Sequence, residues 1–171
     1  MTEKEFNHIV LPLTRPIYSF ALNMTGNSAD AADITQDVMI KLWDSRRELK
    51  EIKSPKAWAL AMTRNLCLDW LKKQKPVYDE QEILRYKGQG TDLLYILEMQ
   101  DTAEAVRQII LSLPSPQKEV MILRELEELE FDEISRITGL GLNNIRVLLS
   151  RGRSKVKEIL VKKFQISKYE N

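Results

Sequence analysis

Hydrophobic residues recur along this chain at intervals of three and four positions, the spacing of one face of an α-helix. The alternation of apolar and polar positions that marks a half-buried strand is nearly absent. Prolines, glycines and capping residues separate the periodic segments. The pattern therefore predicts an all-α protein.

The first predicted helix begins at a sequence that resembles a capping box, Thr2 with Glu5. Pro12 and Pro16 should kink or split it, because proline removes a backbone donor and clashes with the preceding turn. The second part is expected to run from Ile17 to Met24.

After Gly26, we expect Ser28 to cap a helix that ends near Ser45. One face of this helix is apolar: Ala31, Ile34, Val38 and Leu42. Another face is charged: Asp30, Asp33, Asp37, Lys41 and Asp44. Two interpretations stay open, an ordinary amphipathic helix with an Asp37–Lys41 pair, or a surface whose repelling carboxylates dock on a basic partner.

The next helix, Pro55 to Lys75, should begin at Ser54-Pro55, a cap followed by proline at the first helical position. It is apolar on most sides, so we expect it at the centre of a first bundle. Its two tryptophans, Trp58 and Trp70, suit either a core or base stacking. Its polar residues are few: Arg64, Asn65, Asp69, Lys72, Lys73 and Lys75.

Residues 77–91 carry glycines and mixed charges without a helical period, which predicts a linker. Helical periodicity returns from Asp92 to Leu111, in two pieces that meet near Asp101-Thr102. Leu113 to Pro116 should contain a stop and a new cap, followed by a helix from Gln117 to Leu126.

The stretch Phe131 to Ile159 predicts a helix, a short turn and a second helix. Ser135 is small enough for a close helix crossing, and Gly139 can adopt the left-handed conformation that ends the first helix. Asn143 is expected to cap the second helix. The apolar positions that should pack between the two helices are Ile134, Ile137, Leu140, Ile145, Leu148 and Leu149.

Charge is segregated across this stretch. Carboxylates precede the second helix, whereas that helix carries Arg146, Arg151, Arg153, Lys155 and Lys157. A basic second helix after a tight turn is typical of a helix that enters the major groove of DNA. A solvated basic helix on a bundle, with cations that suit the helix dipole, is the other interpretation.

The composition limits the alternatives. The chain has 171 residues, of which 43% are hydrophobic and 30% charged, and its net charge is only +1, so local clustering carries the charge signal. The single cysteine, Cys67, excludes an internal disulfide and a thiolate zinc site, and fits a reduced, cytoplasmic location. No signal pattern or membrane span is expected.

An enzyme is not expected. His8 is the only histidine and Cys67 the only thiol, no Ser-His or Cys-His relay has a partner nearby in sequence, and no glycine-rich phosphate loop is present. Asp30, Asp33 and Asp37 lack the further ligands that a metal site needs. We expect no cofactor, no metal and no small-molecule substrate.

Three stretches, in order, resemble bacterial RNA polymerase sigma factors of the extracytoplasmic-function class, in the sigma-70 family. They are MTGNSADAADITQDVMIKLW, SPKAWALAMTRNLCLDWLKKQK and LPSPQKEVMILRELEELEFDEISRITGLGLNNIRVLLSRGRSKVKE. The resemblance implies two helical domains joined by a flexible linker: region 2 at 1–76, the linker at 77–100, and a four-helix, winged-helix-like region 4 at 101–165.

The resemblance implies that region 2 has two tasks. Its acidic helix resembles the one that docks on the clamp of the largest catalytic polymerase subunit, through Asp30, Asp33, Gln36, Asp37 and Lys41. The next helix resembles the one that opens DNA and binds a flipped base of the −10 element. The residues implied there are Arg64, Asn65, Asp69, Lys72 and Lys73.

Region 4 is implied to bind the −35 element as duplex. The residues implied are Asn143, Asn144, Arg146, Ser150, Arg151, Arg153 and Lys155. Two departures from the family pattern are visible. Glu130 stands where relatives often cap the first helix with Ser or Thr, and Val147 and Leu148 stand where many carry Ser and Arg.

The expected function is that of a sigma factor, which binds core RNA polymerase and directs it to promoters by sequence-specific DNA binding and strand opening. The expected partners are core polymerase, promoter DNA and an anti-sigma factor, which could hold the cytoplasmic protein at the inner membrane. The alternative is a stand-alone helix-turn-helix regulator whose N-terminal helices sense or dimerise.

Overall fold

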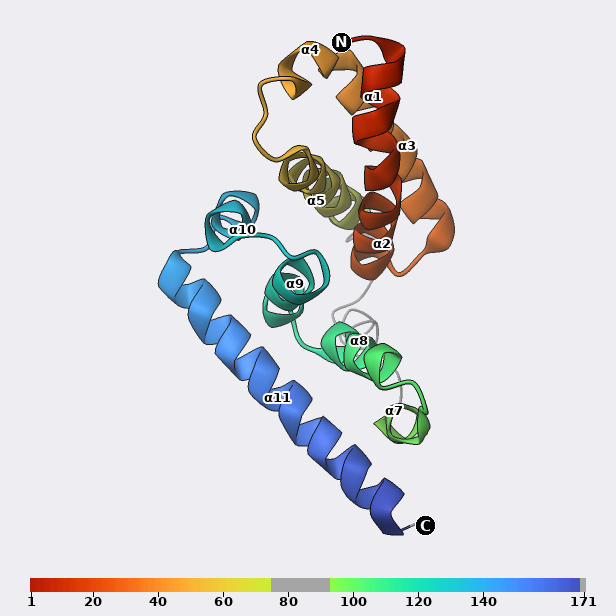
Figure 1. Cartoon of the computed structure of the whole chain (residues 1–171), viewed down its shortest axis with the longest axis vertical. Coiled ribbons are helices and arrows are strands. Elements are labelled where there is room, and N and C mark those ends of the chain that lie inside the picture. The colour runs from red at the N-terminus through yellow and green to blue at the C-terminus, as the bar shows by residue number, and fades with distance from the viewer. Residues whose placement is uncertain (75–92, 170–171) are drawn as a thin grey trace. The chain divides into compact units, whose positions relative to one another are not determined.

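The computed structural model describes residues 1–74 and 93–169, and all the regular secondary structure there is helical, which confirms the all-α prediction. The chain divides into two compact units, Met1–Val77 and Tyr78–Asn171 (Figure 1). Residues 77–91, where we expected a linker, lie outside the described residues. In the described ranges, no helix is long and apolar enough to cross a membrane.

The first unit is a small bundle in which α2 packs against both α3 and α5 (Figure 1). Its elements are α1 (Glu3–Val10), the 3-10 turn η1 (Leu11–Leu13), α2 (Thr14–Thr25), α3 (Ser28–Asp44), α4 (Arg46–Leu49) and α5 (Pro55–Gln74). The capping box is confirmed: the Thr2 N–H donates to Glu5 Oε2 at 2.7 Å and the Glu5 N–H to Thr2 Oγ1 at 3.3 Å. The predicted interruption is confirmed at η1, which contains Pro12.

The starts of the next two helices were predicted with unequal success. Ser28 is not the cap of α3; Asn27 is, and its Oδ1 accepts the Asp30 N–H at 3.0 Å. The sequence placed the helix one residue late, because serine and asparagine are both good caps and stand side by side. Ser54 does cap α5, since its Oγ accepts the Ala57 N–H at 3.3 Å.

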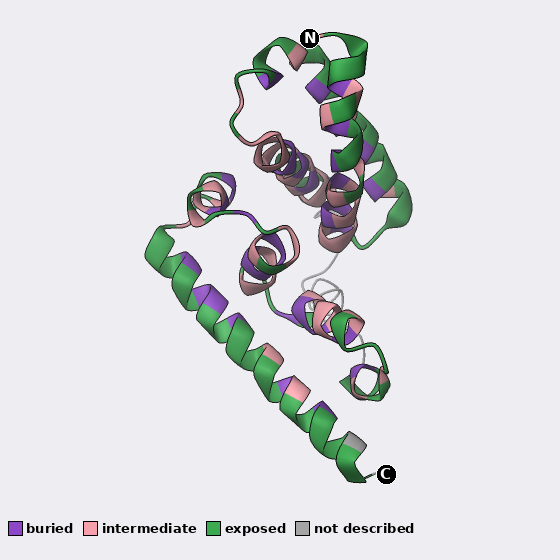
Figure 2. Cartoon of the chain, in the orientation of Figure 1, coloured by how far each residue is buried: buried purple, intermediate pink, exposed green. Residues whose placement is uncertain are grey.

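The core of the first unit is formed by apolar faces of α1, α2, α3 and α5. Ile17 of α2, Val38 of α3 and Leu60 of α5 are fully buried. Trp58 and Trp70 are partly buried and pack against this core. The bundle therefore packs one side of α3 and of α5 into the core and leaves the other side of α3 exposed (Figure 2); α5 likewise has exposed polar residues.

The second unit is arranged along α11 (Leu142–Tyr169), its longest helix (Figure 1). The other elements are α7 (Leu93–Glu98), α8 (Thr102–Ser112), α9 (Gln117–Met121), the π-helical turn η3 (Ile122–Leu126) and α10 (Phe131–Thr138). Helices α7, α8, α9 and α10 all contact α11. Residues 93–98, whose periodicity predicted a helix although the domain boundaries placed them in the linker, form α7, and its Ile96 is buried against Ile109 and Ile159.

Two helix starts before the helix-turn-helix differ in how well they were predicted. Asp101 caps α8 at the expected junction, its Oδ1 accepting the N–H groups of Ala103 and Glu104. The new cap expected between Leu113 and Pro116 is not made by a side chain: Pro116 stands at the cap position of α9, and no side chain accepts a hydrogen bond there. The first-turn N–H of Lys118 instead donates to the Pro114 carbonyl at 2.8 Å.

The helix-turn-helix has the predicted turn. Gly139 is left-handed, with φ of 74°, and its N–H donates to Ser135 O at 2.9 Å. Ser135 Oγ also bonds the Leu140 carbonyl at 2.7 Å, which ties the turn to α10. The prediction that Asn143 caps the second helix is wrong, because α11 already begins at Leu142 and the Ile145 N–H bonds Gly141 O.

Candidate functional site

The exposed face of α3 forms an acidic surface, which we define as Asp33, Gln36, Asp37, Ile40, Lys41 and Asp44. All six side chains are exposed, while Ile34 and Val38 between them are buried. In the part of the chain that the structure describes, the carboxylates of Asp33 and Asp37 form no ion pair, with Lys41 or with any other residue. Asp30 lies one turn before Asp33 on the same side of α3; it is half-buried in the first turn, where a carboxylate suits the positive end of the helix.

An apolar residue stands in the middle of the acidic surface. Ile40 is 59% exposed and follows Asp33, Gln36 and Asp37 at helical spacing. Trp43, in the last turn of α3, is 40% exposed, and the Arg46 guanidinium lies 4.5 Å from its ring centre. The surface therefore combines negative charge with an apolar centre, a composition suited to a protein partner. Sequence reasoning missed Ile40 because its position also fits the edge of the buried stripe.

The polar residues predicted on α5 share one face. Asn65, Asp69, Lys72 and Lys73 are exposed and lie at helical spacing, whereas Arg64 is half-buried at the edge of this face. The opposite side, with Ala59, Leu60, Thr63 and Cys67, is buried in the bundle. The structure thus brings four of the five predicted residues together on an open surface.

The cations of α11 lie on two flanks of the helix. At about 100° per residue, Arg146, Ser150, Arg153 and Lys157 fall on one side, which we call the Arg146 flank. Asn144, Arg151, Lys155 and Lys162 fall on the other, the Arg151 flank. The helix is buried between these flanks on the side of Ile145, Leu149 and Gly152, and exposed on the opposite side (Figure 2).

Arg146 is held in place by two neighbours. Its Nη1 donates to Asn143 Oδ1 at 3.1 Å, and its guanidinium carbon lies 5.7 Å from the centre of the Phe131 ring. The Arg124 guanidinium lies 4.9 Å from the same ring and donates to the Leu129 carbonyl at 2.7 Å. Because such contacts restrict a long side chain, Arg146 is oriented before any ligand arrives.

Next to Phe131 lies a hollow of about 340 Å³ on the Arg146 flank. Its lining residues are Phe131, Arg146, Leu149, Ser150, Arg153, Ser154 and Lys157. Three cations and two hydroxyls around one hollow form a favourable environment for an anionic oxygen. Ser154 and Lys157 were not among the predicted site residues. The sequence could have indicated them, because they follow Arg146 by eight and eleven residues and so lie near the same side of the helix.

Arg153 has a partner within the chain. Its Nη2 lies 2.6 Å from Oε1 of Glu125, on η3, and its Nε donates to the same oxygen. The two side chains are 54% and 33% exposed. Lys155 and Lys162 of the other flank share Glu158, and their hydrogen bonds lower the pKa of that carboxyl below its usual range. Of the predicted arginines on α11, Arg151 has no such partner among the described residues.

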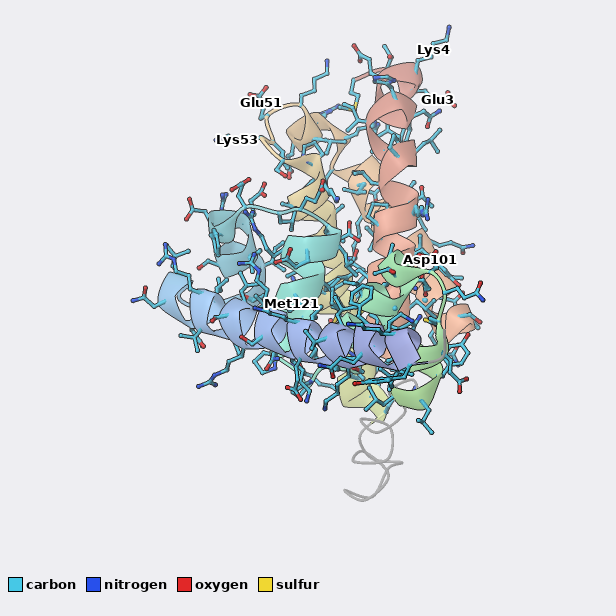
Figure 3. All side chains as sticks on the ribbon, turned by 60° about the horizontal axis from the view of Figure 1, so that its bottom comes forward. Glu3, Lys4, Glu51, Lys53, Asp101 and Met121 are labelled. Carbon is cyan, nitrogen blue, oxygen red and sulfur yellow. The ribbon has the colours of Figure 1, made fainter. Side chains whose placement is uncertain are left out.

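A close helix contact fixes α11 beneath these flanks. Gly152 is buried, and a Cβ placed on it would come within 2.6 Å of Met121 Cγ, on α9. Figure 3 labels Met121 where α9 meets α11. Sequence reasoning did not predict this role, because a glycine within a basic helix gives no sign of what it packs against.

The chain matches two family models. One, described as Sigma-70 region 2, matches residues 9–77, and the other, described as Sigma-70, region 4, matches residues 103–156. Each match falls within one of the two units, and together they cover most of the chain.

Relatives by sequence are RNA polymerase sigma factors. The chain is 26% identical over 151 residues to the sigma factor YlaC of Bacillus subtilis, covering 85% of this chain and 86% of that protein. It is 26% identical over 157 residues to the ECF sigma factor SigW of the same organism, covering 84% and 82%. It is 24% identical over 168 residues to the probable sigma factor RfaY of Xanthomonas campestris, and it spans 42% of that longer protein.

Solved structures show the same fold. The sigma factor RpoE of Bartonella quintana, in complex with the anti-sigma factor NepR, matches with a TM-score of 0.67 at 19% identity, over 92% of this chain and 97% of that one. CnrH, in complex with the cytosolic domain of CnrY, matches with a TM-score of 0.61 at 16% identity, over 94% and 90%.

Proposed function

The chain belongs to the sigma-70 family, in its extracytoplasmic-function class, and from this we propose how its three polar surfaces divide the work of a sigma factor. The N-terminal unit binds core RNA polymerase and single-stranded promoter DNA, and the C-terminal unit binds the upstream promoter element as duplex. One observation carries the proposal. The polar faces of α3, α5 and α11 are exposed, while the apolar faces of the same helices are buried in the cores of the two units.

The acidic surface of α3 is the proposed polymerase contact. Its carboxylates have no ion pair within the described chain, so a basic surface on the clamp of the catalytic subunit would supply their partners. Ile40 would add an apolar contact at the centre, where interface energy tends to concentrate. Asp30, one turn before Asp33 on the same face, would extend this contact, and as a half-buried carboxylate in the first turn it also suits the positive end of the helix.

The exposed face of α5 is the proposed contact for the opened strand. Asn65 and Asp69 can hydrogen-bond the polar edge of an unstacked base, while Lys72 and Lys73 lie one to two turns further on and can follow the phosphates. Unstacking a base costs a few kcal/mol, which such contacts offset. Arg64, at the edge of the face, completes the set.

The flanks of α11 are the proposed duplex contacts. A recognition helix in the major groove has a phosphate backbone on each side, and this helix has cations on each side. Arg146, held by Phe131 and Asn143, lies nearest the start of the helix, where base edges are within reach. Ser150, Ser154 and Lys157 around the hollow would hold a phosphate oxygen.

The partners follow from the family. Its members are transcription initiation factors rather than catalysts, and we propose core polymerase and promoter DNA as the partners here, in the cytoplasm. The structures of both solved relatives described above are complexes with a second protein, the anti-sigma factor NepR or the cytosolic domain of CnrY. An anti-sigma factor is therefore also proposed. The stand-alone regulator is not favoured, because the N-terminal unit matches region 2.

Reconstituted transcription tests the proposal. The purified chain should co-elute with bacterial core RNA polymerase, and the complex should start transcripts at defined positions on genomic fragments where core alone does not. A chain that elutes separately from core polymerase, yet binds duplex DNA by itself, would contradict the proposal and favour the stand-alone regulator.

A further inference from the structure

The exposed ridge between the two flanks of α11 contains an apolar side chain. At about 100° per residue, the centres of the Arg146 and Arg151 flanks lie roughly 150° apart around the helix, and Val147 lies near the middle of the sector between them. Val147 is 45% exposed. The next residue, Leu148, is 9% exposed and belongs to the core. Packing therefore explains why residue 148 is apolar, but it does not explain why residue 147 is apolar.

The neighbours of Val147 one turn before and after it, on the ridge and on the adjoining flanks, are polar. Asn143 and Asn144 precede it by one turn, Ser150 and Arg151 follow it by one turn, and all four are exposed. A valine isolated among polar residues contributes little to folding. It also lies in the second turn of α11, within the N-terminal part of a recognition helix that contacts base edges.

The groove supplies one apolar group that valine can recognise. When cations on both flanks of a helix meet the two phosphate backbones, the ridge between them faces the base pairs. In the major groove the thymine C5-methyl is the apolar feature of the base edges, and small aliphatic side chains contact it. No polar side chain can recognise that methyl by a hydrogen bond.

We propose that Val147 is a specificity-determining residue that contacts the C5-methyl of one thymine in the upstream promoter element. This rests on the proposed function, because it requires α11 to lie in the major groove. The role is distinct from that of the arginines: Val147 discriminates between bases and adds nothing to the salt-dependent attraction.

Replacing thymine by uracil removes the methyl and leaves the base pair intact, which gives a direct test. The complex of the full chain with bacterial core polymerase is used to select promoters from a library with a randomised upstream cassette. Each thymine of the selected duplex is then replaced singly by deoxyuridine, and the affinities of wild type, Val147→Ala and Val161→Ala are compared. Val161 is the matched control, since it is 46% exposed on the same helix and lies beyond the region 4 match.

One replacement should weaken binding by wild type and by Val161→Ala about fourfold, the factor that corresponds to one buried methyl at about 0.8 kcal/mol. The same replacement should leave the affinity of Val147→Ala unchanged. If no deoxyuridine distinguishes wild type from Val147→Ala, the inference is wrong while the sigma-factor function stands. A methyl effect that persists in Val147→Ala and disappears in Leu142→Ala would assign the role to Leu142 instead. A complex that selects no upstream sequence would contradict both the inference and the proposed function of α11.

Discussion

Helices α3 and α11 both present charged faces to solvent, but they differ in how many of the charged side chains have partners within the chain. The carboxylates Asp33 and Asp37 of α3 form no ion pair within the described residues. On α11, Arg153 is paired with Glu125, Arg146 is held by Asn143 and Phe131, and Lys155 shares Glu158 with Lys162. One face leaves its charges uncompensated, whereas the other holds most of its charges in position.

The difference fits two kinds of partner. A carboxylate that loses its solvent in a protein interface needs an opposite charge from the other side, so an unpaired surface is complementary to a basic protein. Phosphates attract any exposed cation, and binding strength then depends on how many cations are free to meet them. Discrimination between bases needs side chains in fixed positions, which the contacts of Arg146 provide.

The largest effect should come from the acidic surface. Asp33→Asn with Asp37→Asn should lose core polymerase binding, because a charge left without its partner in an interface costs about 2–5 kcal/mol. The fold should be unaffected, since both side chains are exposed and their mutual repulsion is relieved by a few tenths of a kcal/mol at most. Sedimentation or co-elution with core polymerase measures the first effect and thermal unfolding the second.

A matched control changes the same number of charges elsewhere on the first unit. Glu3→Gln with Glu51→Gln removes two exposed carboxylates that lie on other elements (Figure 3). This variant should bind core polymerase as the wild type does. Equal binding by the Asp33/Asp37 variant and this control would remove α3 from the interface.

The next largest effect should come from Lys163, a charged residue whose hydrogen bonds stabilise the second unit. Lys163 of α11 is 7% exposed, and its Nζ donates to the carbonyls of Ile96, Leu97 and Met99, which end α7. Lys163→Met should destabilise the second unit by about 1–3 kcal/mol, because carbonyls lose a charged donor while remaining partly buried. Lys162→Met, one residue away and exposed, is the control and should change the unfolding free energy by less than about 0.5 kcal/mol.

The smallest effects separate the arginines of α11. Arg151→Ala should weaken binding to all duplexes alike and lower the salt slope by about one, because a phosphate contact is lost. Arg153→Ala should have a smaller effect on the slope, since Glu125 already occupies this guanidinium at 2.6 Å. Losing the Arg153–Glu125 ion pair should lower the free energy of unfolding by no more than about 1 kcal/mol, as expected for an exposed pair. Affinities measured at several salt concentrations, with equal slopes for both variants, would show that Glu125 releases Arg153 to the DNA.

The sequence predicted those features that depend on local chemistry. Gly139 had to end α10, because few other residues adopt a left-handed conformation, and Asp101 had to begin α8, because its carboxylate is a strong cap. The cap of α3 was misplaced where Asn27 and Ser28 are both capable. The start of α11 was misplaced because its first turn contains Asn143, a residue that also suits a cap.

The features that escaped prediction depend on contacts between distant residues. Lys163 lies more than sixty positions from the carbonyls it caps, and a lysine near a helix end normally suggests only solvent. Gly152 has to be a glycine because Met121 packs against its Cα, with no room for a Cβ. Arg153 binds Glu125, which lies 28 residues earlier in the chain. Helical spacing and charge segregation singled out the charged residues of α3 and α11, and the family resemblance gave them their roles, which stay predictions.

Site-specific photocrosslinking from the two helices tests the division of work most directly. A photoreactive residue is placed at Gln36 on α3 or at Asn144 on α11, and each variant is assembled with core polymerase on a promoter fragment. Position 36 should crosslink to the catalytic polymerase subunit and position 144 to the upstream DNA. Crosslinks from position 36 to DNA, or from position 144 to protein alone, would contradict the assignment of α3 to the polymerase and α11 to the promoter.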